Sequence, residues 1–540
     1  MIEDSENNLS IIKEAFEQFQ NGDFVSSKKN CERVLLDSKN NPDALNLLIL
    51  ISRSTKKLGK AEEVAKLALK EHPDHAFLSN SLGLVLMDQR RFPEAISAFK
   101  RALESKKNRI EIICNLGFAH YEFGEMDEAE LLFKKALVID PNYSRAISGY
   151  INLSITKFDF VTAKQFINLG NKLELSDPDF ITAKAIYFLC KGDLKNSYDL
   201  FNRVVGISKE YADAVVNRGL INLIQGNIND GWEDFSLRRK RRWNRSIERY
   251  NKIIKWEGQS LKDKKILIWS EQGLGEVILS LSLLHNIVSI SDQIIIECDH
   301  KLVKLLAYSF PGIKVISKND KANFYNMNFD FQSSSFELIK FFYNKNKTEN
   351  RFTTYLHASV SKVNRIRDKY KSFYGDLPLV GISWASPSAA HSYTKNIPLN
   401  LWDELVSSKK VSIVNLQYGR SREELEQFYS DKNYNLINDG EVNTDRSFDE
   451  FAAQINALDL VISVSNTTAH LSGGLGQKTW VLVPPIGPSS MWYWFYNSSY
   501  CPWYPSVSLF RRTAGKDKEF MNNIYCKFKL WVDDKNLKNH

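Results

Sequence analysis

Two segments of the chain place polar residues where a strand pattern turns directly into a helix pattern. The first is the glycine loop, EQGLGE at residues 271–276, which follows the apolar run 265–269. Glycines let a ligand approach the backbone closely, and the first amides of a helix lack partners and attract anions. The loop therefore predicts a binding turn, but a plain tight turn has the same composition. Glu276 falls in the first helical turn, a position that the helix dipole also favours for an acid.

The second segment, residues 461–476, reads VISVSNTTAHLSGGLG. Asn466 suits the N-cap of a helix, and the amides and hydroxyls of Thr467 and Thr468 then lie at the end of the strand, where an anion can bind. His470 follows Asn466 by four residues, so the two share one helix face. Two interpretations of His470 stay open, a buried structural residue and a ligand contact.

The periodicity around both segments predicts alternating strands and helices after residue 256. Expected strands are 265–269, 293–297, 313–316, 379–384, 411–416, 458–464 and 479–483. Expected helices between them include 277–287, 301–308 and 399–406. This order predicts two doubly wound, Rossmann-like α/β lobes, 246–372 and 373–540, facing a ligand cleft between the carboxyl ends of their strands. The stretch 318–350 has no pattern that places its elements.

An internal repeat occupies residues 1–245. Small residues recur every 34 positions, at Ser27, Ala61, Ala95, Ala129, Ala163, Ser197 and Gly231. An apolar residue follows each of them by four positions. This register resembles the tetratricopeptide repeat, a helix pair in which small residues allow two helices to cross closely. It predicts an α-helical superhelix whose concave face suits protein or peptide partners. A spacer or a dimerisation element is the alternative.

The composition is that of a soluble protein. Of 540 residues, 43% are hydrophobic and 25% are charged, the net charge is +8, and the sequence shows neither a secretory leader nor about 18 consecutive apolar residues. The six cysteines have no metal-ligand or redox spacing. We expect a cytoplasmic location and no membrane span. The basic run 238–245 is interpreted as a solvated helix end or linker, because Trp243 is its only aromatic residue and nucleic-acid sites interleave several.

Four motifs occur in an order that indicates a known family. They are EQGLGE after WEGQSLKDKKILIW, then GISWASPSAAHSYTKNIPL, ALDLVISVSNTTAHLSGGLG and SYCPWYPSVSLFRR. Together they resemble the bacterial tetratricopeptide-repeat glycosyltransferases whose catalytic part is similar to the heptosyltransferases, and the resemblance covers nearly the whole chain. It implies a GT-B module of two lobes. In architecture the chain is more distantly similar to the protein O-linked N-acetylglucosamine transferases.

The resemblance also implies roles for individual residues. The family's glycine loop and acidic residue fall on Gly273, Gly275 and Glu276, which makes Glu276 the general base, with glutamate where the family usually has aspartate. The family's lysine ahead of a proline matches Lys395 and faces the donor diphosphate. The motif that approaches the nucleotide-sugar matches Ser465 to His470, whose first position is commonly aspartate in heptosyltransferases.

The prediction is therefore a metal-independent, inverting glycosyltransferase without a cofactor, which moves a hexosyl, heptosyl or N-acetylhexosaminyl group from a nucleotide-sugar. Asp177 and Asp179 flank Pro178 at a repeat turn, so they are not expected to bind a metal at the cleft. The acceptor is expected to be a protein or peptide held in the repeat groove. Two alternatives are a non-catalytic scaffold with a GT-B shell and a nucleic-acid-binding adaptor. The sugar, the nucleotide base and the acceptor depend on the shape of the cleft. A fragment that begins near Trp256 is expected to fold alone.

Overall fold

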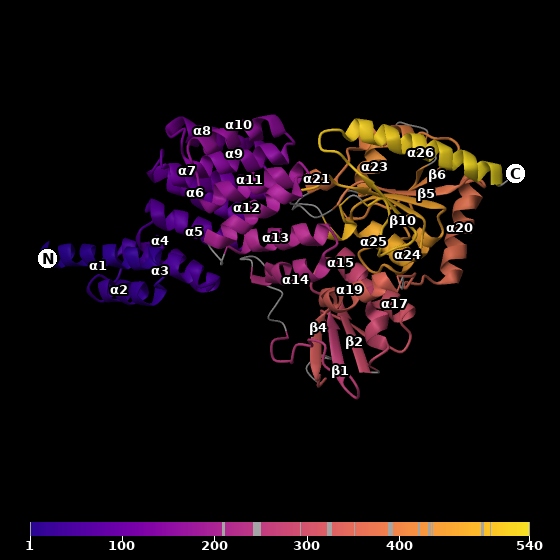
Figure 1. Ribbon diagram of the computed structural model, residues 1–540, viewed down its shortest axis with the longest axis horizontal. Helices are drawn as coiled ribbons and strands as arrows, with labels where there is room; N and C mark the ends of the chain where they lie inside the picture. Colours follow the sequence, from indigo (N-terminus) through magenta and orange to yellow (C-terminus); the bar gives the residue numbers. More distant parts are fainter. Residues whose placement is uncertain are drawn as a thin grey trace. The chain divides into compact units, whose positions relative to one another are not determined.

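The computed structural model describes residues 2–207, 211–240, 250–291, 293–320, 327–349, 352–386, 392–419, 422–429, 434, 436–487, 491–496 and 498–538. Contacts between residues divide the chain into two compact units. The first comprises Met1–Ala214, and the second is built from Val215–Arg239 and the described residues from 250 onward. Figure 1 shows the first unit as helices alone and the second as helices with strands.

The first unit consists of antiparallel helix pairs (Figure 1). Its helices are α1 (Ile2–Gln20), α2 (Phe24–Asp37), α3 (Pro42–Ser54), α4 (Leu58–Glu71), α5 (Ala76–Asp88), α6 (Phe92–Ser105), α7 (Ile110–Phe123), α8 (Met126–Ile139), α9 (Ser144–Thr156), α10 (Phe160–Lys172), α11 (Pro178–Cys190) and α12 (Leu194–Ile207). Helix α13 (Ala212–Ile224) begins in this unit and continues into the second. The predicted helical repeats are confirmed.

The 34-residue spacing has a direct cause in the contacts between paired helices. A Cβ atom on Gly83 of α5 would lie only 2.5 Å from the ring of Phe99 on α6. Where the repeat carries serine in place of alanine, the serine hydroxyl donates a hydrogen bond to a backbone carbonyl on the paired helix. Ser197 Oγ, for example, donates to the Ala185 oxygen at 2.8 Å. Each repeat therefore needs a small residue at the crossing, and a polar one is tolerated only with a partner.

The seventh frame of the repeat packs within the second unit. Trp232 of α14 (Ile228–Ser236) lies 5.7 Å from the ring of Phe336 and 6.2 Å from that of Trp492, between ring centroids. The amide of Tyr496 donates to the oxygen of Ile224 on α13 at 2.8 Å. Residues Val215–Arg239 are accordingly part of the second compact unit.

A four-stranded parallel sheet, in the order β3-β2-β1-β4, forms the first lobe of the second unit. Its strands are β1 (Lys265–Trp269), β2 (Gln293–Cys298), β3 (Lys314–Ser317) and β4 (Phe331–Ser334), and Leu267 pairs with Ile295 and Gln332. Its helices are α15 (Leu274–Leu281), α16 (Leu284–Val288), α17 (His300–Ser309) and α19 (Leu338–Thr348). Strand β4 and helix α19 lie in the described part of the stretch 318–350, for which the sequence pattern predicts no elements.

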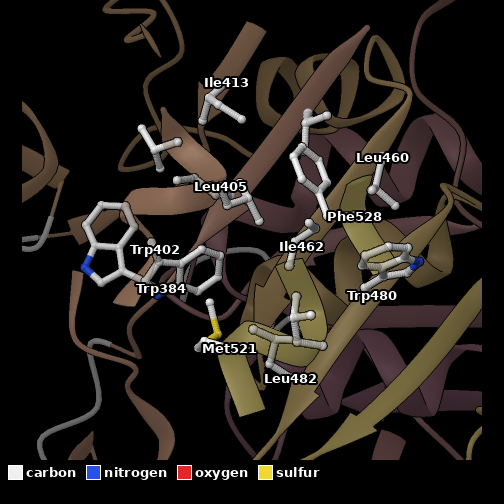
Figure 2. Packing of buried hydrophobic residues seen from close by; sticks show 14 of the residues in the cluster. Trp384, Trp402, Leu405, Ile413, Leu460, Ile462, Trp480, Leu482, Met521 and Phe528 are labelled. Atoms are coloured by element: carbon white, nitrogen blue, oxygen red, sulfur yellow. The ribbon is translucent and has the colours of Figure 1, made fainter. Parts of the chain in front are cut away.

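A six-stranded parallel sheet, in the order β10-β9-β8-β5-β6-β7, forms the second lobe. Its strands are β5 (Leu379–Ser383), β6 (Ser412–Asn415), β7 (Leu436–Ile437), β8 (Leu460–Val464), β9 (Thr479–Val483) and β10 (Val507–Arg511). Its helices are α20 (Val360–Tyr374), α21 (Ser392–Lys395), α22 (Asp403–Val406), α23 (Arg422–Tyr429), α24 (Asp449–Asn456), α25 (Thr467–Gly474) and α26 (Asp517–Lys538). Figure 2 shows its apolar core, in which Met521 and Phe528 of α26 join strand residues such as Ile462 and Leu482. The predicted parallel sheets are confirmed.

Candidate active site

The glycine loop of the first lobe meets helix α25 of the second lobe. A Cβ atom on Gly275 would lie 2.6 Å from Cδ2 of His470, closer than real atoms approach. One turn further along α25, a Cβ on Gly473 would lie 2.5 Å from the ring of Tyr504, which also contacts His470. Gly275 therefore lets the N-terminal turn of α15 pack directly on α25, and Gly473 lets Tyr504 pack closely on the same helix. The two motifs singled out in the sequence are thus brought together.

Glu276 lies at this junction, half-buried in the first turn of α15. Its Oε1 atom accepts a hydrogen bond from the hydroxyl of Tyr493 at 3.2 Å. A Cβ on Gly273 would lie 2.9 Å from its Oε2 atom, so the loop glycine leaves space for the carboxylate. A carboxylate that is fixed and only partly exposed can accept a proton from a bound hydroxyl.

Lys395 reaches the same junction from α21. Its side chain is buried, which lowers the pKa of the ammonium, and the negative charge of Glu276 acts in the opposite direction. Arg512, at the end of β10, donates from Nη1 to the backbone oxygens of Thr394, Lys395 and Asn396 at 3.0 to 3.2 Å. Arg512 is the last residue of the motif SYCPWYPSVSLFRR, and it holds the turn that contains Lys395, a role that its place in the motif does not reveal.

Asn466 caps α25 as predicted. Its Oδ1 atom accepts from the amide of Ala469 at 3.4 Å and from Ser463 Oγ at 3.0 Å. Its Nδ2 atom donates to Ser383 Oγ at 2.8 Å and to the Ala385 oxygen at 3.0 Å. The oxygen and the nitrogen of the Asn466 side chain therefore connect β8 to β5. Asn466 shapes the end of the sheet and holds α25 in place.

The hydroxyl groups that flank Asn466 differ in their partners. Ser465 Oγ accepts a hydrogen bond from Trp494 Nε1 at 2.7 Å. The amide of Thr467 donates to the Tyr418 hydroxyl at 3.4 Å, a long hydrogen bond at the N-terminus of α25. Thr468 Oγ1 is buried and has no partner among the described residues. A buried polar atom without a partner is costly, and Thr468, which is 0% exposed, does not reach solvent.

His470 is buried among aromatic rings. Its ring stacks on Trp494, with 4.9 Å between centroids and 17° between planes, and Nδ1 lies 3.1 Å from the Tyr504 hydroxyl. Burial, and after it the positive charge of Lys395, lower the pKa of His470 to about 3. The imidazole is therefore neutral near pH 7 and cannot balance the charge of a diphosphate.

The two ring nitrogens of His470 differ in their surroundings. Nδ1 lies 3.1 Å from the Tyr504 hydroxyl, whereas Nε2 is buried without a partner in the described part of the chain. The neighbouring Tyr355 hydroxyl donates to the Ile278 carbonyl at 2.5 Å. Of the two interpretations, the contacts favour a structural His470.

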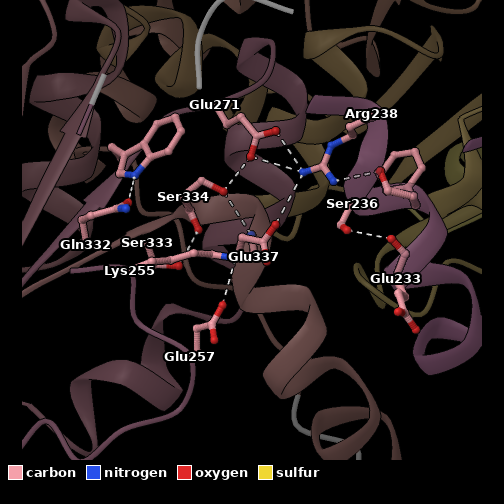
Figure 3. A network of polar contacts seen from close by, with 12 residues as sticks. Glu233, Ser236, Arg238, Lys255, Glu257, Glu271, Gln332, Ser333, Ser334 and Glu337 are labelled. Atoms are coloured by element: carbon pink, nitrogen blue, oxygen red, sulfur yellow. Dashed lines mark hydrogen bonds and ion pairs between the residues drawn. The ribbon is translucent and has the colours of Figure 1, made fainter. Parts of the chain in front are cut away.

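A buried ion-pair network holds the start of the glycine loop (Figure 3). Arg238 Nη2 donates to both carboxylate oxygens of Glu271, at 2.9 and 3.2 Å, and lies 3.9 Å from Glu337 Oε1. Ser334 Oγ donates to Glu271 Oε2 at 2.7 Å. The side chains of Arg238, Glu271 and Glu337 are 6%, 0% and 3% exposed, so these charges depend on one another.

Arg238 was predicted to belong to a solvated basic run. It is buried instead, with its guanidinium over the rings of Trp232, Phe235 and Phe336 at 5.6, 4.7 and 5.2 Å. Trp232, Phe235 and Arg238 follow one another by three residues, and this spacing is the signal that could have placed Arg238 on an apolar helix face. Residues 241–249, which hold the rest of the run, lie outside the described residues.

Among the described residues, no group of three or more His, Cys, Asp or Glu side chains has an arrangement that could hold a metal ion. Within the same part of the chain, no helix combines the length and the apolar character needed to cross a membrane.

Comparison with known proteins identifies the repeats. The tetratricopeptide-repeat model matches residues 86–149. Protein FlbA of Caulobacter vibrioides is 25% identical over 91% of this chain and 78% of its own length. The peroxisomal targeting signal receptor of Saccharomyces cerevisiae is 25% identical over 31% of this chain, and the human protein O-mannosyl-transferase TMTC3 is 27% identical over 26% of it. These two matches span 29% and 16% of the relatives. The chain therefore contains tetratricopeptide repeats.

Two solved structures are similar to part of this chain. A tetratricopeptide repeat protein from Parabacteroides merdae is 19% identical, with a TM-score of 0.37 over 45% of this chain and 96% of that one. Pseudomonas aeruginosa pilF is 18% identical, with a TM-score of 0.33 over 38% of this chain and 94% of its own.

Proposed function

We propose that the second unit is a glycosyltransferase of the GT-B kind, which takes a sugar from a nucleotide-sugar. The observation that carries the proposal is the meeting of Glu276, Lys395 and the N-terminus of α25 between two parallel-sheet lobes. A carboxylate, an ammonium and the amides of a helix N-terminus are the groups that a transfer from a nucleoside diphosphate needs. The order of the four family motifs along the chain supports the same function.

The proposed reaction is a direct displacement. The acceptor hydroxyl gives its proton to the Glu276 carboxylate while its oxygen forms a bond to the anomeric carbon. The bond from that carbon to the diphosphate oxygen breaks, and the nucleoside diphosphate leaves with the electron pair. Lys395 and the helix amides at Thr467 and Thr468 stabilise its negative charge. Attack opposite to the leaving group inverts the anomeric centre. The chain's own residues supply both the base and the positive charge, so the proposed step runs without a metal or cofactor.

The contacts change the role proposed for three residues of the second motif. Ser465, Asn466 and His470 have their hydrogen-bonding groups directed into the protein, apart from Nε2 of His470. We assign them to the shape of the donor site, and the anion contacts to Lys395, Thr467 and Thr468. The same inward contacts also favour the second candidate, a scaffold that keeps the GT-B shell without catalysis.

A thermal-shift panel of UDP, GDP, ADP, CMP and dTDP with their sugar conjugates tests donor binding. A ligand that binds only the folded protein raises its unfolding temperature, so we expect one nucleotide series to raise it and Lys395→Ala to weaken that shift. No shift from any nucleotide, with circular dichroism showing a folded protein, would favour the scaffold.

Tetratricopeptide repeats mediate protein interactions, and we propose that the repeats of this chain recruit a protein or peptide acceptor. A fragment from Val215 keeps the contacts of Trp232 and Arg238, whereas a fragment from Trp256 loses them. We therefore expect the longer fragment to fold, to bind the nucleotide and to lose transfer to a protein acceptor. Full transfer by that fragment would contradict a recruiting role.

A further inference from the structure

The hydroxyl of Tyr493 contacts Glu276 from the second lobe. It lies 3.2 Å from Glu276 Oε1, and the tyrosine is 3% exposed. Burial, and after it the negative charge of Glu276, raise the pKa of the Tyr493 phenol well above its ordinary value. The phenol therefore keeps its proton, and because a carboxylate can only accept, the tyrosine is the donor of this hydrogen bond.

The backbone around Tyr493 is held on several sides. The residue lies in the short 3-10 helix η6 (Trp492–Trp494), and its carbonyl accepts from Trp503 Nε1 at 2.8 Å. Its ring packs edge-on against His470, with centroids 5.0 Å apart. Phe495 ends the turn at φ 44°, a region that non-glycine residues rarely adopt, and Arg511 donates to the Phe495 oxygen. The position of the hydroxyl is thus fixed by the packing of its own lobe.

We infer that Tyr493 is a positioning residue for Glu276, so that the proposed base is correctly oriented only when both lobes contribute to it. The inference rests on the proposed function. A glutamate side chain has several rotatable bonds, and a hydrogen bond to one carboxylate oxygen selects one of their arrangements. The proton of the acceptor still passes to Glu276, while Tyr493 keeps its own proton throughout.

A double-mutant cycle separates positioning from a general effect on structure. Wild type, Tyr493→Phe, Glu276→Gln and the double variant are compared by the release of nucleoside diphosphate from UDP-, GDP-, ADP- and dTDP-linked sugars. Tyr343→Phe is the matched control, because Tyr343 is a buried phenol of the same aromatic cluster, 4.6 Å from Trp503 between centroids. Thermal unfolding of each variant checks that it is folded.

If Tyr493 acts through Glu276, Tyr493→Phe lowers kcat by about tenfold and leaves KM for the sugar nucleotide unchanged. In the Glu276→Gln background the same change then has no further effect, and Tyr343→Phe matches wild type. A loss that multiplies with that of Glu276→Gln, or no loss at all, overturns the positioning role and leaves the proposed function intact. Wild-type turnover by Glu276→Gln, or no release by any protein, instead contradicts the proposed function and removes the role of Tyr493 with it.

Discussion

The repeat unit and the α/β unit both depend on small residues at close contacts, but the partners of these residues differ. In the repeats, Gly83 faces Phe99 of the next helix, and the same relation recurs along the chain. In the α/β unit, Gly275 faces His470, which belongs to the other lobe. A local, recurring contact leaves a period in the sequence, whereas a contact between distant segments leaves only single residues without a pattern.

The two units also differ in how they bury charge. The α/β unit encloses Arg238 between Glu271 and Glu337, all three almost fully buried. In the repeats, the pair of Arg53 and Asp88 joins neighbouring repeats with the arginine 19% exposed. Removal of a buried partner leaves a charge without compensation, while a partly exposed group can be solvated by water. The α/β unit is therefore expected to be more sensitive to the loss of a single charge.

The largest expected effect is that of Arg238→Ala. It removes the buried cation that faces the carboxylates of Glu271 and Glu337, although Lys255 still lies 3.7 Å from Glu337, so the free energy of unfolding of the α/β unit should fall by about 3–5 kcal/mol. Urea unfolding followed by tryptophan fluorescence reports on this unit, because all eleven tryptophans lie after residue 231. Arg446→Ala, which removes an exposed arginine of the same unit, should change the value by less than about 0.5 kcal/mol. Equal effects of the two variants would contradict the buried network.

A smaller effect is expected in the repeats from Gly83→Ala. Alanine normally stabilises a helix relative to glycine, but here its Cβ would lie 2.5 Å from the Phe99 ring. We expect a loss of about 1–3 kcal/mol in thermal unfolding followed by circular dichroism, since overpacking shifts the ring and the backbone. Gly59→Ala on α4, where no atom lies within 4 Å of the new Cβ, should instead stabilise the protein. The same sign for both variants would show that helix propensity outweighs the contact.

The smallest effect is a pH dependence that comes from His470. Its pKa is about 3 in the folded protein and about 6.5 when exposed, so the unfolded chain binds more protons between these values. Its stabilising contribution is complete above pH 6.5 and is lost as the pH falls towards 3. Between pH 7 and 5.5 the loss is about 1 kcal/mol. His470→Gln should reduce the slope of unfolding temperature against pH relative to wild type. His300→Gln, which changes a half-exposed histidine, should leave the slope of unfolding temperature against pH as in wild type.

Several elements could be read from the sequence because their signals are local. The repeat spacing predicts the helix pairs, and the apolar runs at 265–269 and 458–464 predict strands β1 and β8. Asn466 was expected as an N-cap, since the capping preference depends on its immediate neighbours alone. Each of these features depends on residues that lie close together in the sequence.

Other features could not be read, because they depend on residues far apart in the chain. Strand β4 is short, with two serines in FQSS, and its sheet position comes from pairing with β1. Tyr493 lies outside every motif, and Arg512 ends the motif SYCPWYPSVSLFRR without a signal for its role. Only the folded chain places them beside Glu276 and Lys395. Arg238 lies among aromatic rings because α14 packs within the second unit. Its basic neighbours in the sequence instead indicate a solvent-exposed run. The roles of Glu276 and Lys395 stay predictions.

The release of nucleoside diphosphate from a panel of sugar nucleotides, by wild type, Glu276→Gln and Lys395→Ala, tests the central proposal most directly. We predict release by wild type from one nucleotide series. Glu276→Gln should lower turnover by about a hundredfold to ten-thousandfold with donor affinity unchanged, because glutamine cannot accept the proton. Lys395→Ala should weaken donor binding and lower turnover, each by about tenfold or more. Wild-type turnover by Glu276→Gln, or no release by a folded wild-type protein from any donor, would contradict the proposed glycosyltransferase.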